Sequence, residues 1–141
     1  MWNYNEALDV FNNLPFNEKV LVALKEEALY RYVLKGKAFI DITPYHGQNN
    51  IGFINIAILP QYRRNGLSKV LCDKAKEDCK LLGIDSLIWR CKKINVPSYK
   101  SAISNNFELI SQDENEFTLF CPIRLKVVSG GFHPPDHGAL P

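Results

Sequence analysis

Ile58-Leu-Pro-Gln-Tyr-Arg-Arg-Asn-Gly-Leu-Ser-Lys-Val-Leu71, residues 58–71 of this chain, joins an apolar run to an amphipathic helical pattern through a basic loop. The first N–H groups of a helix have no partner within it, and the helix dipole places positive charge there. The first turn after Gly66 holds Ser68 and Lys69, and no acid occurs before Asp73. Two interpretations stay open: a strand–loop–helix site that holds phosphates, or an ordinary exposed turn with solvated arginines.

The surrounding pattern predicts a mixed α/β fold with one sheet. Because a strand, a crossover helix and another strand follow one another, we expect strands 51–59 and 86–91 to be parallel. The expected elements, in order, are helices over 4–13 and 17–27 (N-cap Asn17), strands over 28–34 and 38–43, a polar loop over 44–50, a strand over 51–59, a helix over 67–82, a strand over 86–91, a short helix from Pro97 to Asn105-Asn106, and a hairpin of 107–111 with 116–121.

Length and composition indicate one domain. The chain has 141 residues, of which 46% are hydrophobic and 23% charged, with a net charge of +2. This small charge favours neither nucleic acid nor a membrane as a partner, and no apolar run is long enough to span a bilayer. We expect one domain over residues 1–126 and a Gly/Pro-rich tail over 127–141. The histidines of that tail, His133 and His137, together with Asp136, are interpreted as incidental, so no metal is expected.

The four cysteines are Cys72, Cys79, Cys91 and Cys121, and they form no Cys-x-x-Cys pair. Two fall in one predicted helix and one in a predicted strand, so we expect free, buried thiols in a reducing cytoplasm. The first residues also lack the basic start and apolar core of a signal peptide. A cytoplasmic location is therefore the expectation.

The loop carries a family resemblance. Ile58-x-Pro-x-x-Arg63-x-x-Gly66-x-Ser68 resembles the acyl-coenzyme A loop of the GNAT superfamily of N-acetyltransferases. The family pattern is Arg or Gln, two residues, Gly, one residue, then Gly or Ala. Ser68 holds the last place, a small departure that still permits close approach of the backbone.

A second block strengthens the resemblance. Asn95-x-x-Ser98 followed by Phe107 is similar to the family's Asn-x-x-(Ala/Ser)…Gly-Phe segment, with Asn106 in the glycine place. The resemblance covers about residues 28–122. It implies a GNAT-like single mixed sheet with splayed parallel central strands, flanking helices and a C-terminal hairpin. The family's first strand is expected to be missing, so either the sheet is shorter on that side or a second subunit covers its edge in a homodimer.

The resemblance also implies acetyl-CoA as co-substrate and a place for it. The pantetheine arm would enter the gap between the splayed strands and pair with the backbone of residues 56–58 like an added strand. The pyrophosphate would lie on the amides of residues 63–68, and Asn95 and Ser98 would lie near the thiol. The implied cofactor-binding residues are Ile56, Ala57, Ile58, Arg63, Arg64, Asn65, Gly66, Leu67, Ser68, Asn95 and Ser98.

The catalytic residues depart from the family pattern. Where the family often places a tyrosine as the acid, this chain has Ala102. Tyr99, one helical turn earlier, and Ser98 are the candidate catalytic residues. Direct transfer to an amine also needs a base, yet strand 51–59 carries no Asp or Glu. Its lone polar side chain, Asn55, is either a substrate contact or a residue at an open edge or bulge.

Two further residues are weighed as bases. Tyr45 and His46 precede the central strand, and each is either a base or water-orienting group, or a plain loop residue. The leading interpretation is an N-acetyltransferase that moves an acetyl group from acetyl-CoA directly to the primary amine of a small molecule or peptide. The alternatives are a non-catalytic acyl-CoA-binding module, acting as a sensor or assembly partner, and an unrelated α/β domain with a similar loop.

Overall fold

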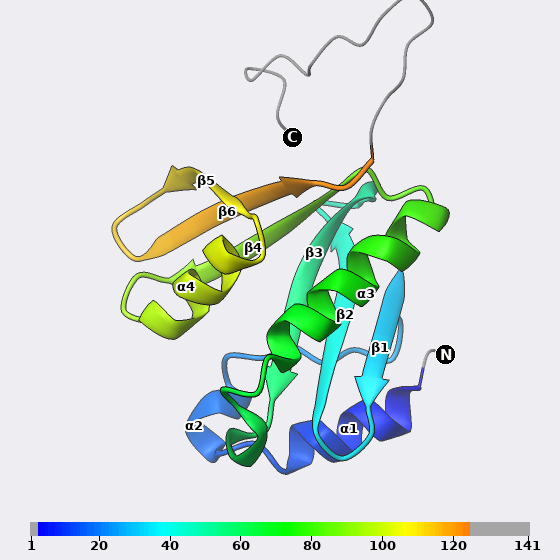
Figure 1. Cartoon of the computed structure of the whole chain (residues 1–141), viewed down its shortest axis with the longest axis vertical. Helices are drawn as coiled ribbons and strands as arrows, with labels where there is room; N and C mark the ends of the chain where they lie inside the picture. The colour runs from blue at the N-terminus through cyan, green and yellow to red at the C-terminus, as the bar shows by residue number, and fades with distance from the viewer. Residues whose placement is uncertain (1–2, 125–141) are drawn as a thin grey trace, which may run out of the picture.

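The computed structural model describes residues 3–124 and shows one six-stranded mixed sheet in the order β1-β2-β3-β4-β6-β5, with flanking helices (Figure 1). The candidate metal residues of the tail lie outside the described residues, as does the predicted domain end at 126. The elements are helices α1 (Tyr4–Asn12), α2 (Phe16–Lys19), α3 (Leu67–Leu81) and α4 (Val96–Ser104), a 3₁₀ turn η1 (Pro60–Tyr62), and strands β1 (Tyr30–Leu34), β2 (Ala38–Tyr45), β3 (Gln48–Ile58), β4 (Ser86–Lys92), β5 (Glu108–Gln112) and β6 (Glu116–Pro122).

The core lies on both faces of the sheet, because successive side chains of a strand point to opposite faces. Ile40 of β2 packs in one cluster with Leu71 and Ala75 of α3. Its neighbour Phe39 packs in a second cluster with Val10 of α1. The helices α3 and α1 therefore cover opposite faces of the sheet, and both are held by complete burial of these side chains.

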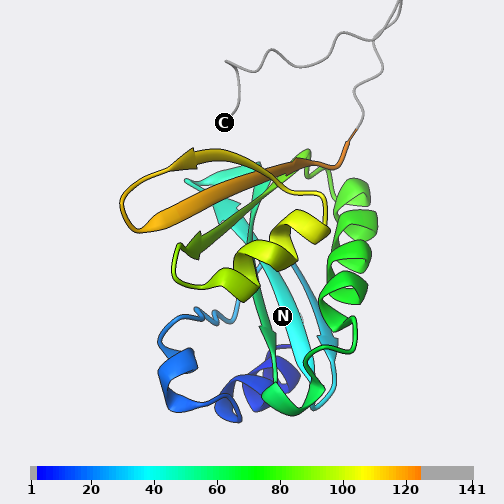
Figure 2. The same ribbon diagram turned by 60° about the vertical axis from the view of Figure 1, so that its left-hand side comes forward.

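The central strands diverge, as the resemblance predicted. β3 and β4 pair in parallel only where residues 51–53 meet residues 86–88. Beyond Phe53, β3 is paired with β2 alone, and β4 continues with β6 alone. Figure 2 shows α4 in front of the place where the two strands separate. The edge of β3 that faces β4 is therefore open from Ile54 to Ile58.

The predicted second helix over residues 17–27 is wrong in most of its length. The helix there, α2, begins at Phe16 after Pro15 and ends at Lys19, so Asn17 is not its N-cap. The backbone carbonyls that a helix would use are taken by side chains from the sheet. Asn55 donates to the carbonyl of Ala23, and Arg31 donates to the carbonyls of residues 25 and 26. Tertiary hydrogen bonds have replaced helical ones.

The predicted polar loop over 44–50 is also wrong. β2 runs on to Tyr45 and β3 starts at Gln48, so the connection is a two-residue turn. Both turn residues, His46 and Gly47, have positive φ angles of 50° and 77°. Such turns match the twist of a hairpin, which explains why polar residues extend the strands here.

The start of the sheet agrees with the expected loss of the family's first strand. Among the described residues no strand precedes Tyr30, and β1 forms one edge of the sheet. A second subunit on this edge stays a prediction.

Candidate active site

A groove of about 750 Å³ opens where β3 and β4 diverge. The open backbone of β3 forms one wall, and β4 with the start of α4 forms the other. This single cavity brings together residues from both sequence blocks, which are far apart along the chain. The predicted site residues that line it are Ile56, Ala57, Ile58, Arg63, Ser68, Asn95 and Ser98.

The loop before α3 supplies unpaired donors beside the groove. Gly66 is the N-cap of α3, with a φ of 77°, and the space where a side chain would stand is open within 4 Å. Among the described residues, no backbone acceptor pairs with the N–H groups of residues 64–69. Arg64, Asn65 and Gly66 are exposed, Leu67 is half-buried, and none of the four lines the groove itself. Unpaired amides at an uncovered glycine fit the pyrophosphate of a CoA molecule.

The start of α4 is fixed by hydrogen bonds around Ser98. The backbone N–H of Ser98 donates to Asn95 Oδ1 over 3.2 Å, so Asn95 caps the helix. The hydroxyl oxygen of Ser98 accepts from Trp89 Nε1 over 3.1 Å. Burial raises the pKa of the neighbouring Cys91 thiol, while a hydrogen bond with Ser98 opposes that rise. Ser98 is thus the predicted catalytic residue that the structure brings into the groove.

The other catalytic candidates lie elsewhere. The ring of Tyr99 packs on Phe117, with 4.7 Å between ring centroids, and does not line the groove. Ala102, at the place of the family tyrosine, is fully buried. Tyr45 stacks on Phe53 beside the hairpin turn, and neither Tyr45 nor His46 lines the groove.

The exposed side chain of Arg63 is fixed by contacts within the protein. Its Nε donates to the carbonyl of Ile58 over 2.9 Å, and its guanidinium forms an ion pair with Glu18 of α2. This contact fastens α2 to the loop that precedes α3. Arg64, with a φ of 66°, has no side-chain partner among the described residues. Of the two predicted arginines, Arg64 is therefore the one whose charge is uncompensated.

Sequence reasoning missed a polar cluster between the start of α3 and the end of α4, of which Ser68 and Ser101 line the groove. Ser68 Oγ lies 2.5 Å from Ser101 Oγ. Asn105 Nδ2 donates to Ser68 Oγ over 3.2 Å and to the carbonyl of Ser101 over 2.8 Å. Asn105 is buried, and no residue from 3 to 124 forms a hydrogen bond with its Oδ1. The spacing of four residues between Ser101 and Asn105, at the end of a predicted helix, was the available signal.

Sequence reasoning also missed a group of charged residues on the face of β4 opposite α3. Arg90, Lys92 and Glu116 line the groove together with Asn55. Arg90 and Glu116 form an ion pair of 2.9 Å. The alternation of β4 could have shown it, because Trp89 and Cys91 are buried whereas Arg90 and Lys92 are exposed.

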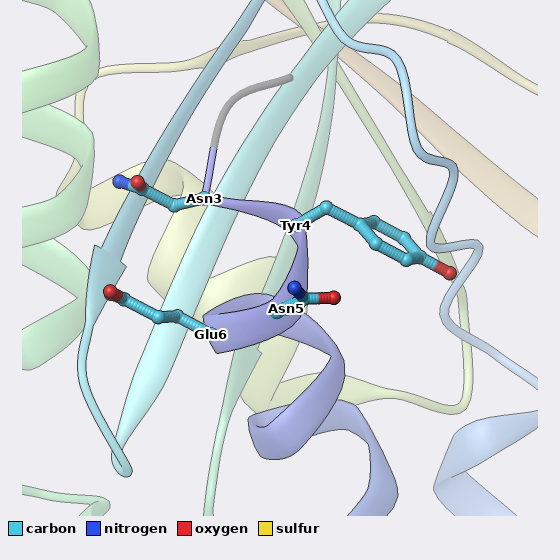
Figure 3. A pocket seen from close by; sticks show the side chains of 4 residues that line it. All are labelled: Asn3, Tyr4, Asn5 and Glu6. Carbon is cyan, nitrogen blue, oxygen red and sulfur yellow. The ribbon is translucent and has the colours of Figure 1, made fainter.

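A second hollow of about 290 Å³ lies at the start of α1, lined by the four consecutive residues Asn3 to Glu6 (Figure 3). Asn3 and Glu6 point to one side in that view and Tyr4 to the other, so the side chains do not converge. Within residues 3–124 no group of three or more His, Cys, Asp or Glu residues is arranged to hold a metal. No helix in that range is both long and apolar enough to cross a membrane.

A model of the acetyltransferase (GNAT) family matches residues 11–102, which is more than half of the chain. The chain belongs to this family. A search of curated protein sequences finds no significant match to this GNAT protein. Membership, together with the groove, supports acetyl-CoA-dependent acetyl transfer in general.

Solved structures share the GNAT fold. The ribosomal-protein-S18-alanine N-acetyltransferase of Escherichia coli aligns with a TM-score of 0.65 and 18% identity, covering 88% of this chain and 90% of that one. A GNAT-family acetyltransferase of Streptococcus pneumoniae aligns at 0.58 and 20%, covering 66% and 64%. The PaiA N-acetyltransferase of Thermoplasma acidophilum, in complex with coenzyme A, aligns at 0.55 and 18%, covering 61% and 53%. The GNAT protein thus spans less than two thirds of the last two.

Proposed function

We propose that this protein is an N-acetyltransferase that moves the acetyl group of acetyl-CoA directly to a primary amine. The observation that carries the proposal is the single groove, which unites the open edge of β3, the loop before α3 and Ser98. In the transfer, the amine nitrogen forms a bond to the acetyl carbon and the carbon–sulfur bond breaks. The amine loses a proton to water or a base, and the thiolate gains one. The product is an amide and the free thiol of CoA.

Each wall of the groove has a part in this proposal. The amides of residues 64–69 bind the pyrophosphate, and the open backbone of residues 56–58 pairs with the pantetheine arm. Ser98, whose oxygen accepts a hydrogen bond from Trp89, is the proposed donor to the leaving thiolate. Positioning of the two reactants supplies much of the acceleration, so a weak acid such as a serine hydroxyl is compatible with turnover. The free, buried cysteines support a cytoplasmic setting.

A second candidate function is a non-catalytic acyl-CoA-binding module. Three observations favour it: Ala102 replaces the usual tyrosine, Tyr99 packs on Phe117, and β3 carries no carboxylate. Calorimetry with acetyl-CoA followed by thiol release on a panel of amines separates the two candidates. Saturable binding with thiol release on one class of amine is the result expected of the enzyme. Binding without release on any amine would establish the binding module instead.

A pair of glycine variants tests the cofactor site. Gly66→Trp should abolish acetyl-CoA binding, because the added ring occupies the uncovered space beside the unpaired amides. Gly36→Trp is the matched control, since Gly36 has a similar φ of 73° and equally open surroundings in the β1–β2 turn. Equal affinity in the two variants would refute this place for the pyrophosphate.

A further inference from the structure

The groove has two differently built sides, which follow from the alternation of its strands. Ile54 of β3 and Trp89 and Cys91 of β4 belong to the core cluster that includes α3. Their neighbours along the strands, Asn55 on β3 and Arg90 and Lys92 on β4, face the opposite side of the sheet. Asn55 reaches the carbonyl of Ala23 there, which places the segment after α2 on this second side.

The two sides have different tasks if the proposed function holds, on which this inference rests. The unpaired amides of residues 64–69 and the hydroxyl of Ser98 belong to the side of α3 and α4, so the cofactor enters from there. An amine needs an open path to the thioester. The second side of the groove supplies it, between β4 and the segment after α2.

The charges on this second side do not cancel. Arg90 is paired with Glu116 over 2.9 Å, and the Arg63 guanidinium is paired with Glu18. Lys92 is the remaining charged residue of the groove, and no ion pair within residues 3–124 reaches it. A site with one excess positive charge favours a ligand with one negative charge.

The side-chain amide of Asn55 adds a hydrogen-bond acceptor to this side of the groove. Its Nδ2 is committed to the carbonyl of Ala23, so the partner fixes which atom of the amide is the nitrogen. Oδ1 has no donor among the described residues and is left to accept a hydrogen bond. Leu21 and Val22 flank this side with apolar surface.

We propose that the acceptor is a primary amine that also carries a carboxylate, as amino acids do. Lys92 binds the carboxylate, and Asn55 Oδ1 accepts a hydrogen bond from the amine. Leu21 and Val22 contact the carbon chain between the two groups. The specificity of the enzyme for its acceptor thus comes from the second side of the groove.

The test uses matched amines that differ only in the carboxylate: glycine against methylamine, β-alanine against ethylamine, and γ-aminobutyrate against propylamine. Thiol release by the full chain should show a higher kcat/KM for the carboxylated member of at least one pair. Lys92→Gln should raise KM for that acceptor about two- to fivefold, the size of one exposed ion pair. Lys92→Glu should reverse the preference, and added salt should weaken it.

Lys93→Gln is the matched control, because the Lys93 ammonium lies 5.4 Å from the Phe117 ring centroid and does not line the groove. Calorimetry with acetyl-CoA should give the same affinity for all of these variants. Equal kcat/KM within every pair would overturn the inference and leave the proposed enzyme standing. If CoA binds and no amine releases thiol, equilibrium dialysis with γ-aminobutyrate decides: uptake lost in Lys92→Glu supports the inference, and no uptake overturns it.

Discussion

The side-chain amide of Asn105, just after α4, donates to the hydroxyl of Ser68 in the first turn of α3 over 3.2 Å. This bond joins the two helices whose starts form the two halves of the proposed cofactor site. Ser68 stands where the family has glycine or alanine, and its hydroxyl is occupied by Asn105 and Ser101. The serine that departs from the family pattern therefore has polar partners in α4 and just after it.

We predict energetic coupling between Asn105 and Ser68. Asn105→Ala removes a buried donor from two acceptors and should lower the free energy of unfolding by about 1–3 kcal/mol. Ser68→Ala in the Asn105→Ala background should cost less than it does alone, with a coupling of about 0.5–1.5 kcal/mol. Urea unfolding of the four proteins measures this. As a control, substitution of the exposed Ser111 on β5 should have the same effect on stability with and without Asn105→Ala. Additive effects for Asn105 and Ser68 would refute the coupling.

The second prediction separates Ser98 from Tyr99. Ser98→Ala removes the hydroxyl beside the proposed thiol position and should lower kcat by about tenfold or more. The affinity for acetyl-CoA should change much less. Tyr99→Phe should leave kcat unchanged, because the Tyr99 ring packs on Phe117 and does not line the groove. Steady-state kinetics on the best amine gives both numbers, and a larger loss in Tyr99→Phe would exchange their roles.

A third prediction concerns alkaline pH. Burial raises the pKa of Cys72 and that of Cys79 to about 12, from the usual 9.0. Between pH 9 and 12 the unfolded chain loses these protons while the folded protein keeps them. Stability therefore falls as pH rises through this range, by about 1.4 kcal/mol per pH unit for each thiol. Below pH 9 both states are protonated and this contribution is constant.

Urea unfolding at several pH values measures that slope. Cys79→Ala should make the slope shallower than in the unsubstituted protein by about 1.4 kcal/mol per pH unit. Comparison of the two proteins removes the titration of lysines, which both share. Equal slopes in the two proteins would show that the Cys79 thiol ionises as readily in the folded state.

The fourth prediction concerns the point where the central strands part. A Cβ on Gly52 would lie 2.3 Å from Ile42 Cγ2 and 2.9 Å from Leu87 Cδ2. Gly52→Ala should therefore cost about 1–3 kcal/mol of stability through overpacking. Gly47→Ala in the β2–β3 turn has open space and only a backbone penalty, of about 1–2 kcal/mol for its positive φ. Gly52→Ala should also alter the groove, so acetyl-CoA should raise its melting temperature less than that of the unsubstituted protein. Gly47→Ala should keep the full increase. Thermal unfolding with and without acetyl-CoA measures both.

The buried pair of Arg31 and Asp41 gives a fifth prediction. Arg31 Nε lies 2.6 Å from Asp41 Oδ1, and both side chains are almost completely buried. Asp41→Ala would leave the guanidinium buried without its carboxylate and should cost about 3–5 kcal/mol. The exposed Lys69–Asp73 pair is the control, because Asp73→Ala should cost less than about 1 kcal/mol. Equal losses of stability in the two variants would mean that other groups compensate the buried charge of Arg31.

The local structure of the two segments proposed to bind the cofactor was predictable, because it depends on local chemistry. A glycine at positive φ, a helix start without acids and an asparagine cap are properties of short segments, and Gly66 and Asn95 act as their neighbours predict. The parallel pairing of β3 and β4 followed from the length of the crossover between them. Short-range rules therefore sufficed for the local structure of these two segments.

The remainder depends on contacts between distant segments. Residues 20–27 have helical periodicity, yet Arg31 and Asn55 capture their carbonyls, and no local rule predicts such donors. Tyr99 carries the right functional group, but the partner that fixes its ring, Phe117, comes from the last strand. The second side of the groove is assembled from β3, β4 and β6, and its charges meet only in the folded protein.

The irregular segment between α2 and β1 is attached to the sheet by hydrogen bonds to a few of its backbone carbonyls. Arg31 and Asn55 donate hydrogen bonds to its backbone carbonyls, which every amino acid possesses. These hydrogen bonds therefore do not depend on the side chains of the segment. Its exposed residues can therefore change without loss of these hydrogen bonds, whereas Val22, Leu24 and Leu29 also pack against the core. The side of the groove proposed to bind the acceptor is thus tolerant of substitution at its exposed positions.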